Sequence, residues 1–239
     1  MKKFFITATD TDAGKTFVAC ALTQALINKG KRVAVYKPIA AGCDKVNGQL
    51  INEDAQLLTE FSNCNQQISD INPITFEAAI APHIAAENEK RIISIAEIKK
   101  GFTKLISLEA DINITEGAGG WRLPVHISST EDQKPIFLSE FVQLTQQDVI
   151  LVVNMKLGCL NHALLTYQSI LSDGLQCVAW VANNASAEPM SCLVENIASL
   201  EQLLPIPKIA QLDFYPDDKI SVQDKIKAAA MEIDLTTLC

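Results

Sequence analysis

The N-terminal region constrains the fold more than any other part of the chain. An apolar run, FFITAT at 4–9, is followed by the motif GKT at 14–16 and by a helical pattern with one apolar face that ends at 28–30. A second apolar run, RVAVYK at 32–37, comes directly afterwards. The order strand, loop, helix, strand predicts a βαβ unit, in which two parallel strands are joined by a helix.

Further apolar runs predict that this unit belongs to a larger parallel sheet. They lack polar alternation, as expected for strands covered on both faces, and lie at 111–116, 149–154 and 177–183. Helical patterns alternate with the runs, at 52–62, 94–108, 138–147, 160–173 and 190–203. The predicted fold class is α/β, with one doubly wound, mostly parallel sheet, helices on both faces, and a single domain over residues 1–239.

The loop after the first strand carries the clearest sign of function. TATDTDAGKT, residues 7–16, ends like a phosphate-binding loop, but Thr9 stands where the common pattern G-x-x-x-x-G-K-[ST] has its first glycine. A helix that begins here directs free N–H groups and its positive end at a phosphate. Lys15 can reach the terminal phosphates of a nucleotide, and the Thr16 hydroxyl can ligate Mg²⁺. We interpret the segment as a modified phosphate loop in a P-loop NTPase-like fold.

Composition and charge disfavour several other classes of function. The 28 acidic and 20 basic residues give a formal charge of -8 without a basic cluster, which disfavours nucleic acid and anionic membranes as partners. The longest apolar runs are strand-sized, and the N-terminal run becomes polar too early for a signal peptide. Seven scattered cysteines without a C-x-x-C pair, and three distant histidines, indicate neither a disulfide framework nor a zinc site. We expect a cytoplasmic protein.

The loop and several later motifs resemble the dethiobiotin synthetase family. That family has the loop G-T-D-T-x-x-G-K-T, one residue longer than the common pattern, and its first glycine corresponds to Ala8 here. The other motifs follow in the family's order: YKPIAAG at 36–42, NEDA at 52–55, NPITF with APHIAA within 72–86, TEGAGGW at 115–121, NMKLGCLNHALLT at 154–166 and WVAN at 180–183. Beyond residue 183 the resemblance thins, and Asp213-Phe214 takes the place of the family's Pro-aromatic pair near adenine.

The resemblance implies a ligase of biotin biosynthesis that uses ATP and CO₂ to close a cyclic urea on diaminopelargonate. Phosphoryl transfer in such a reaction depends on cations and on oxygen ligands for Mg²⁺ more than on a strong base. The resemblance implies catalytic roles for Thr11, Lys15 and Lys37. The Mg²⁺ ligands that it implies are Thr16, Asp54 and Glu116.

The resemblance also implies which residues bind ATP and the diamine. The ATP contacts are Asp12, Ala13, Gly14, Lys15, Thr16, Phe17 and Asn183. The diamine contacts are Lys37, Ala41, Gly119, Gly158, Cys159, Leu160 and Asn161. The family usually has Ser or Thr at position 41, so Ala41 predicts the loss of a hydroxyl contact. In the family the segment at 158–161 serves the neighbouring subunit's site, which implies a homodimer.

Two alternatives remain, and the first of them shares the longer loop. An ATP-dependent amide synthase of the cobyric acid type carries an appended glutaminase domain, for which this chain is short and has no evident Cys–His motif. A nucleotide-driven partition ATPase has a signature lysine in the loop, where this chain has Asp10. Both are less favoured than the synthetase.

Overall fold

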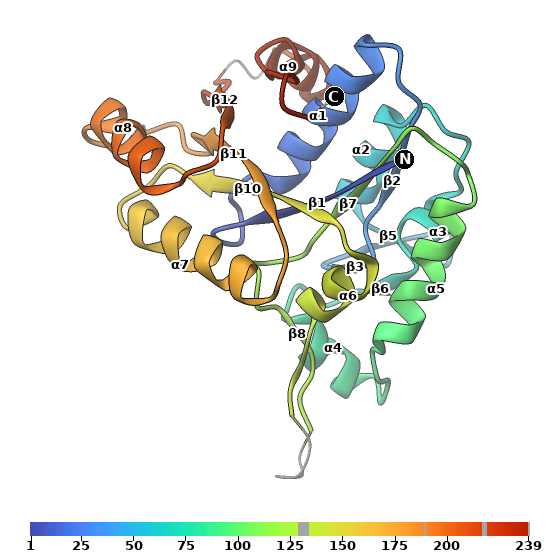
Figure 1. Cartoon of the computed structure of the whole chain (residues 1–239). Helices are drawn as coiled ribbons and strands as arrows, with labels where there is room; N and C mark the ends of the chain where they lie inside the picture. The colour runs from blue at the N-terminus through green and yellow to red at the C-terminus, as the bar shows by residue number, and fades with distance from the viewer. Residues whose placement is uncertain (129–133, 189, 217–218, 239) are drawn as a thin grey trace.

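The computed structural model describes residues 1–128, 134–188, 190–216 and 219–238. At its centre lies a six-stranded sheet in which all neighbouring strands are parallel (Figure 1). In spatial order the strands are β12 (Lys208–Leu212), β11 (Cys177–Asn183), β10 (Asp148–Asn154), β1 (Lys2–Ala8), β7 (Ile112–Glu116) and β2 (Val33–Tyr36). The predicted α/β class is confirmed, and five of these strands coincide with the predicted apolar runs.

Helices cover both faces of the sheet and bury two separate apolar cores. The core on one face includes side chains from α1 (Lys15–Asn28), α2 (Glu53–Phe61), α3 (Ile68–Ile71) and α9 (Val222–Ala230). The core on the other face includes side chains from α4 (Pro82–Asn88), α5 (Ile95–Ile106), α6 (Leu138–Thr145), α7 (Cys159–Ser172) and α8 (Leu193–Leu203). Burial on both faces explains the continuous apolar strands: residues 149–153 of β10 are fully buried.

Three small two-stranded sheets lie outside the central one. A parallel pair joins β3 (Ile39–Ala41) to β6 (Ile74–Phe76), and two antiparallel pairs join β4 (Asp44–Val46) to β5 (Gln49–Ile51) and β8 (Pro124–His126) to β9 (Ile136–Phe137). The hairpin of β8 and β9 projects from the body at the bottom of Figure 1. β3 follows β2 closely in the sequence and contributes to the wall of the cavity described below.

The C-terminal part of the chain differs most from the sequence-based expectation. Neither β12 nor α9 was predicted, and the helix expected from residue 190 begins at Leu193. β12 is a short strand that follows two prolines, and α9 buries only Ile226, Ala229 and Ala230 of its nine residues. So weak an apolar pattern does not predict a helix by itself; packing of α9 against α1 supplies the rest of its stability.

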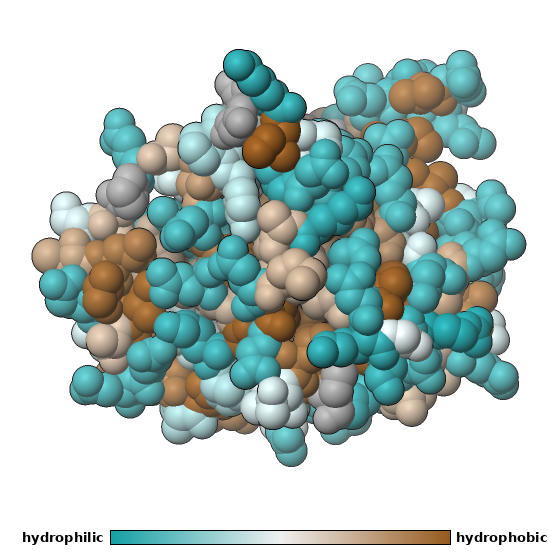
Figure 2. Space-filling view, turned by 90° about the horizontal axis from the view of Figure 1, so that it is seen from above, coloured by the Kyte–Doolittle hydropathy of each residue, from teal (hydrophilic) through white to brown (hydrophobic). Residues whose placement is uncertain are grey.

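Hydrophobic and hydrophilic residues are interspersed on the surface that Figure 2 shows. On the face shown in Figure 2, hydrophobic residues form small groups separated by hydrophilic ones, most evidently at the left edge, on the side where Figure 1 shows α8. Among the described helices, none has the length and apolar character needed to cross a bilayer. The six described cysteines are free thiols, and Cys239 lies outside the described residues.

Candidate nucleotide-binding and catalytic site

The predicted phosphate loop joins β1 to α1 at the carboxyl edge of the sheet. The N–H of Thr9 donates to the carbonyl of Val152 at 3.0 Å, which ties the start of the loop to the neighbouring strand β10. Gly14 ends the loop with a φ of 81°, a left-handed conformation that glycine adopts without strain. Because Gly14 has no side chain to cap α1, the first N–H groups of the helix stay available to a ligand.

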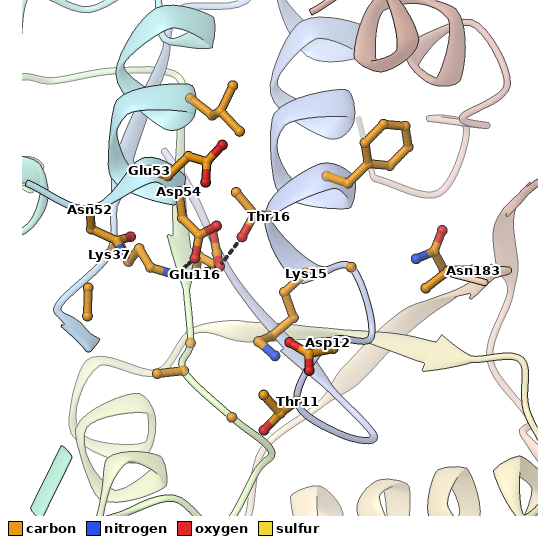
Figure 3. Close-up of a pocket in the computed structure, with 18 of the residues that line it drawn as sticks. Thr11, Asp12, Lys15, Thr16, Lys37, Asn52, Glu53, Asp54, Glu116 and Asn183 are labelled. Carbon is orange, nitrogen blue, oxygen red and sulfur yellow. Dashed lines mark hydrogen bonds and ion pairs between the residues drawn. The ribbon is translucent and has the colours of Figure 1, made fainter. Parts of the chain in front are cut away.

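Asn183, at the end of β11, holds this loop from a distant part of the sequence. Its Nδ2 donates to the carbonyl of Ala13 at 2.8 Å, and the side chain is buried. A Cβ atom on Gly14 would overlap Nδ2 of Asn183, so position 14 needs glycine for this contact as well as for its φ. Figure 3 shows Asn183 on the opposite side of the loop from Glu116.

Lys15, the first residue of α1, extends toward the cavity (Figure 3). The residue is 8% exposed, and its Nζ donates to the carbonyl of Asp10 at 3.3 Å. Burial lowers the pKa of Lys15; the nearby carboxylate of Glu116 opposes this shift, and the charge of Lys37 adds to it. An ammonium group that burial disfavours gains stability when an anion such as a phosphate approaches.

A buried cluster of charges lies beside the loop. Lys37 Nζ is 2.6 Å from Glu116 Oε1 and 3.0 Å from Asp54 Oδ2, and the Thr16 hydroxyl donates to Glu116 Oε1 at 2.8 Å (Figure 3). The side chains of Lys37 and Glu116 are almost fully buried, whereas that of Asp54 is 43% exposed. Burial disfavours the charge of Lys37, but Glu116 and then Asp54 outweigh it and raise the pKa of this lysine. Lys37 is therefore a fixed cation at neutral pH.

Local structure places each member of this cluster. Lys37 follows β2 directly, and its carbonyl accepts a hydrogen bond from Asn72 Nδ2 at 2.7 Å. Glu116 is the last residue of β7, which pairs with β2 in parallel, so both side chains reach the same edge of the sheet. Asp54 lies in the first turn of α2, whose N-cap is Asn52. Asp54 therefore complements the positive end of that helix.

The same cluster has oxygen atoms that fit a magnesium ion. Glu116 Oε2 is buried without a hydrogen-bond partner, although Oε1 has two. Within the part of the chain that the structure describes, no group of three His, Cys, Asp or Glu side chains is placed to hold a metal. Two carboxylates and the Thr16 hydroxyl suit an ion that takes its other ligands from phosphates and water, as Mg²⁺ does.

A cavity of about 1020 Å³ connects the loop with this cluster. Twelve of the predicted site residues line it: Thr11, Asp12, Gly14, Lys15, Thr16, Phe17, Lys37, Ala41, Asp54, Glu116, Gly119 and Asn183. Ala13 is fully buried within the loop. At one end of the cavity the wall is apolar, with Ile39 and Ile80 beside Ala41.

The other end of the cavity is lined by residues that sequence reasoning missed. Asn184, Tyr215 and Lys225 belong to the region where the resemblance thins, and the ring of Tyr215 lies 5.7 Å from that of Phe17. Asp213 and Phe214, aligned with the family's pair near adenine, also line this end. Asn184 directly follows the last motif of the resemblance, WVAN at 180–183. Tyr215 and Lys225 come from the far end of the chain, around β12 and α9, where no local motif identifies them.

The segment 158–161 lies outside the cavity lining. Gly158 has a φ of 95° and is the N-cap of α7, Cys159 is buried, and Leu160 and Asn161 follow in the first turn. Leu157, immediately before this turn, is 94% exposed. Within one chain, therefore, these four predicted substrate contacts are not part of the cavity that holds the other predicted residues.

An ion pair links the phosphate loop to the approach of α7. The carboxylate of Asp10 pairs with Lys156 Nζ, and both side chains are more than a third exposed. The hydrogen bond from Lys156 is the main reason that the pKa of Asp10 is lowered. Position 10, where partition ATPases have their signature lysine, thus carries an aspartate that is paired with Lys156.

Replacing Lys156 by alanine should lower the free energy of unfolding by at most about 1 kcal/mol at neutral pH, since the pair is solvent-exposed. A carboxylate with a lowered folded-state pKa stabilises the fold above its unfolded-state pKa of about 3.9, and loses that contribution as pH falls through the folded value. The difference between wild type and variant in urea unfolding should therefore shrink at low pH, below the unfolded-state pKa. A difference that persists there would show that the effect is not electrostatic.

The fold and this site define a class of nucleotide-binding proteins with a phosphate loop. A family model described as an AAA domain matches residues 2–218. A chain of the MinC:MinD cell division protein complex of Aquifex aeolicus superposes with a TM-score of 0.55 at 15% identity, covering 97% of this chain and 95% of that one. A ParA family ATPase of Chlorobium tepidum gives 0.53 at 13% identity, covering 96% and 90%. Identities this low show a shared fold alone.

Sequence relatives identify the family within this class. The ATP-dependent dethiobiotin synthetase BioD of Alteromonas mediterranea is 47% identical over 219 residues, covering 90% of this chain and 93% of the relative. The protein of the same name from Cellvibrio japonicus is 45% identical over 237 residues, covering 99% and 97%. The chain belongs to the ATP-dependent dethiobiotin synthetase family, and it is an ATP-dependent ligase.

Proposed function

We propose that residues 1–239 act as one synthetase domain in the cytoplasm, and that it forms dethiobiotin from diaminopelargonate, CO₂ and ATP with Mg²⁺. The observation that carries the proposal is the buried cluster of Lys37, Asp54 and Glu116, which lines the same cavity as Lys15 of the phosphate loop. Two cations and two carboxylates in one cavity suit the transfer of a phosphoryl group from ATP to an acid.

The reaction consists of three bond-forming steps. One amine of the diamine attacks CO₂, and loss of a proton leaves a carbamate. A carbamate oxygen then attacks the γ-phosphorus of ATP, and ADP leaves, so that a carbamic-phosphoric anhydride forms. The second amine attacks the carbon of this anhydride, phosphate leaves with the bonding electrons, and the cyclic urea closes after loss of a proton. Negative charge builds up in the phosphoryl transfer, where fixed cations lower the barrier most.

Residues of the loop and cluster have distinct tasks in these steps. Lys15 and the N-terminal N–H groups of α1 bind the terminal phosphates of ATP. Lys37, whose pKa is raised by its carboxylate partners, stays protonated and therefore serves as a cation for the carbamate and transferred phosphoryl oxygens rather than as a base. The Thr11 hydroxyl lines the cavity and contributes a hydrogen bond to the reacting groups.

Mg²⁺ would be held by the Thr16 hydroxyl with the carboxylates of Asp54 and Glu116. When bound, it neutralises charge on the phosphates of ATP. The buried Oε2 of Glu116, which lacks a protein partner, and the partly exposed carboxylate of Asp54 support this assignment.

Replacing Asp54 by alanine should raise the Mg²⁺ concentration for half-maximal activity by about tenfold or more, a loss in the range seen when groups around a metal are removed. Titration of activity with Mg²⁺ at saturating ATP measures this shift. Glu53→Ala is the matched control, because it removes the neighbouring carboxylate in the same turn of α2, which also lines the cavity. Equal curves for the two variants would remove Asp54 from the metal site.

The adenine of ATP would lie at the end of the cavity formed by Phe17, Asn183 and Tyr215. The two rings supply an apolar surface for a flat base. Because Nδ2 of Asn183 already donates to Ala13, its Oδ1 is the atom left to accept a hydrogen bond from the exocyclic amine of adenine.

The substrate's distant carboxylate would be bound by the start of α7 from a second copy of the chain. The residues at the start of that helix, 158–161, are not among those that line this chain's own cavity. The exposed Leu157 and Leu165 beside them are suited to burial against a partner. We infer a homodimer in which each subunit completes the other's site.

Mixing Lys15→Ala and Asn161→Asp chains should restore activity if the dimer shares its sites. One parent lacks the phosphate-directed cation, and the other places a negative charge beside the substrate carboxylate. A hybrid dimer has one site free of both changes, so an equal mixture should reach about a quarter of wild-type activity after random exchange. Lys15→Ala chains mixed with each other serve as the control. No recovery in hybrids verified by mass spectrometry would indicate sites contained within one subunit.

Ring formation itself is the test of the proposed function. Labelled bicarbonate incubated with diaminopelargonate, ATP and Mg²⁺ should give an acid-stable labelled product, with one ADP released per ring. A free carbamate loses CO₂ in acid, whereas a cyclic urea retains the label. ATP hydrolysis without acid-stable label would reject the synthetase and return the amide synthase and the partition ATPase to consideration.

A further inference from the structure

The glycine-rich segment at 117–120 forms part of the cavity wall but has almost no side chains with which to fix itself. Gly117 and Gly119 line the cavity directly after Glu116, and Gly119 has a φ of 59°. A Cβ atom at position 117 would lie 2.8 Å from the ring of Phe5, so the backbone there packs directly on the core. The N–H of Gly117 donates to the carbonyl of Ile6 at 2.9 Å, which ties the start of the segment to β1. Glycines lose more conformational freedom on folding than other residues, so the position of the rest of the segment depends on contacts beyond it.

Those contacts come from the next two residues. Trp121 is 5% exposed, and its ring meets Phe5 edge to face with centroids 6.0 Å apart. Its Nε1 donates to Asp173 Oδ2 at 2.8 Å. Arg122 donates from Nη2 to Asp173 Oδ1, also at 2.8 Å, and from Nε to the hydroxyl of Ser169 at 3.0 Å. Both oxygens of one carboxylate are thus occupied by consecutive residues that follow the glycines.

The stability of helix α7 does not explain why position 173 is an aspartate. It is the C-cap of α7, and a negative charge at the C-terminal end of a helix is disfavoured by the helix dipole. Its side chain is only 9% exposed, so the charge is also removed from water. The hydrogen bonds from Arg122 and Trp121 to Asp173 offset these costs. The same bonds anchor the two residues that follow the cavity wall.

We propose that Asp173 is a positioning residue of the synthetase: it holds Trp121 and Arg122, and through them sets where the backbone of 117–120 meets the bound diamine and its carbamate. The inference rests on the proposed function. It links α7, whose opposite end is assigned to the neighbouring subunit's site, to the wall of this chain's own cavity.

The test compares three variants of the full chain. Asp173→Asn keeps the shape of the side chain and one oxygen acceptor but removes the charge. Trp121→Phe keeps the ring contact with Phe5 but removes the Nε1 donor. Asp70→Asn is the matched control, because it makes the same chemical change in an exposed ion pair with Lys104, also of 2.8 Å, away from the cavity lining.

Measurements are the KM for the diamine, the Kd for ATP, thermal unfolding, and hydrogen exchange of the amides at 117–121. Asp173→Asn and Trp121→Phe should raise the KM for the diamine about tenfold, less than the ~100-fold loss that a 1 Å misplacement can cause, and leave ATP affinity nearly unchanged. Amide exchange at 117–121 should become faster in both variants and stay unchanged in Asp70→Asn.

A purely structural role would lower the unfolding temperature without changing the KM or the exchange at 117–121 relative to the control, and this result would overturn the proposal. Should Asp173→Asn fail to fold, the same measurements on Trp121→Phe decide. If the wild type forms no acid-stable product, the proposed function fails, and hydrogen exchange alone then decides whether Asp173 holds the segment.

Discussion

Replacing Lys15 by alanine should slow ring closure about 100-fold or more and leave the protein folded, since the loss of one group aimed at developing charge typically has this effect. The fold is expected to survive because burial lowers the pKa of Lys15: the folded protein without ATP disfavours this charge, so its removal relieves a cost. In the proposed reaction the same ammonium would stabilise the phosphoryl oxygens once ATP is bound.

Single-turnover formation of acid-stable product measures the rate, and thermal unfolding followed by circular dichroism measures the fold. Lys29→Ala is the matched control, because Lys29 is an exposed lysine at the C-cap of the same helix. A near-normal rate in folded Lys15→Ala protein would contradict the assignment of the loop, as would an equal loss in both variants.

Replacing Lys37 by methionine should affect both activity and stability. Glu116 would keep its burial, with a side chain 1% exposed, but lose the ammonium group 2.6 Å away. Removing one partner of a buried ion pair typically costs about 3–5 kcal/mol of unfolding free energy, because the other charge remains uncompensated. Activity should fall by about 100-fold or more, since the fixed cation at the transferred phosphoryl group is lost.

A double variant separates the two effects. Lys37→Met combined with Glu116→Gln removes both charges of the buried pair and should recover most of the lost stability, because Glu116 no longer leaves an uncompensated charge in the protein interior. It should stay inactive, because neither the cation nor the carboxylate is restored. Urea unfolding and single-turnover assays measure the two quantities. If the double variant were as unstable as Lys37→Met, packing rather than charge would be the cause.

The charged core of the site could be predicted because its parts lie at the ends of strands. Lys37 and Glu116 each end a buried apolar run, and parallel strands bring their carboxyl ends to one edge, so the strand pattern places both residues at that edge. Their roles came from the family resemblance, and that β2 and β7 are neighbours came from the structure. Asp54 had no such support, since an acid in the first turn of a helix has a sufficient structural explanation. Only the family resemblance singled it out.

The end of the cavity that we propose to bind the base could not be predicted in the same way. Tyr215 meets Phe17 through a segment between β12 and α9, two elements with apolar patterns too weak to be recognised. The contact between Asn183 and Ala13 joins residues 170 positions apart, and a hydrogen bond of that kind leaves no local signal. Tertiary packing, rather than propensity, decides these positions.

The amide of Asn183 has a consequence for anyone who wishes to redesign the nucleotide preference of this enzyme. The residue that we propose to contact the base is also the one that fixes Ala13 and fills the space beside Gly14. A substitution of Asn183 chosen to favour another base would therefore also disturb the loop proposed to bind the triphosphate. Selectivity for the base would then be gained at the expense of turnover. Phe17 and Tyr215, which line the cavity without holding the loop through such a bond, are the positions at which the two properties can be tuned separately.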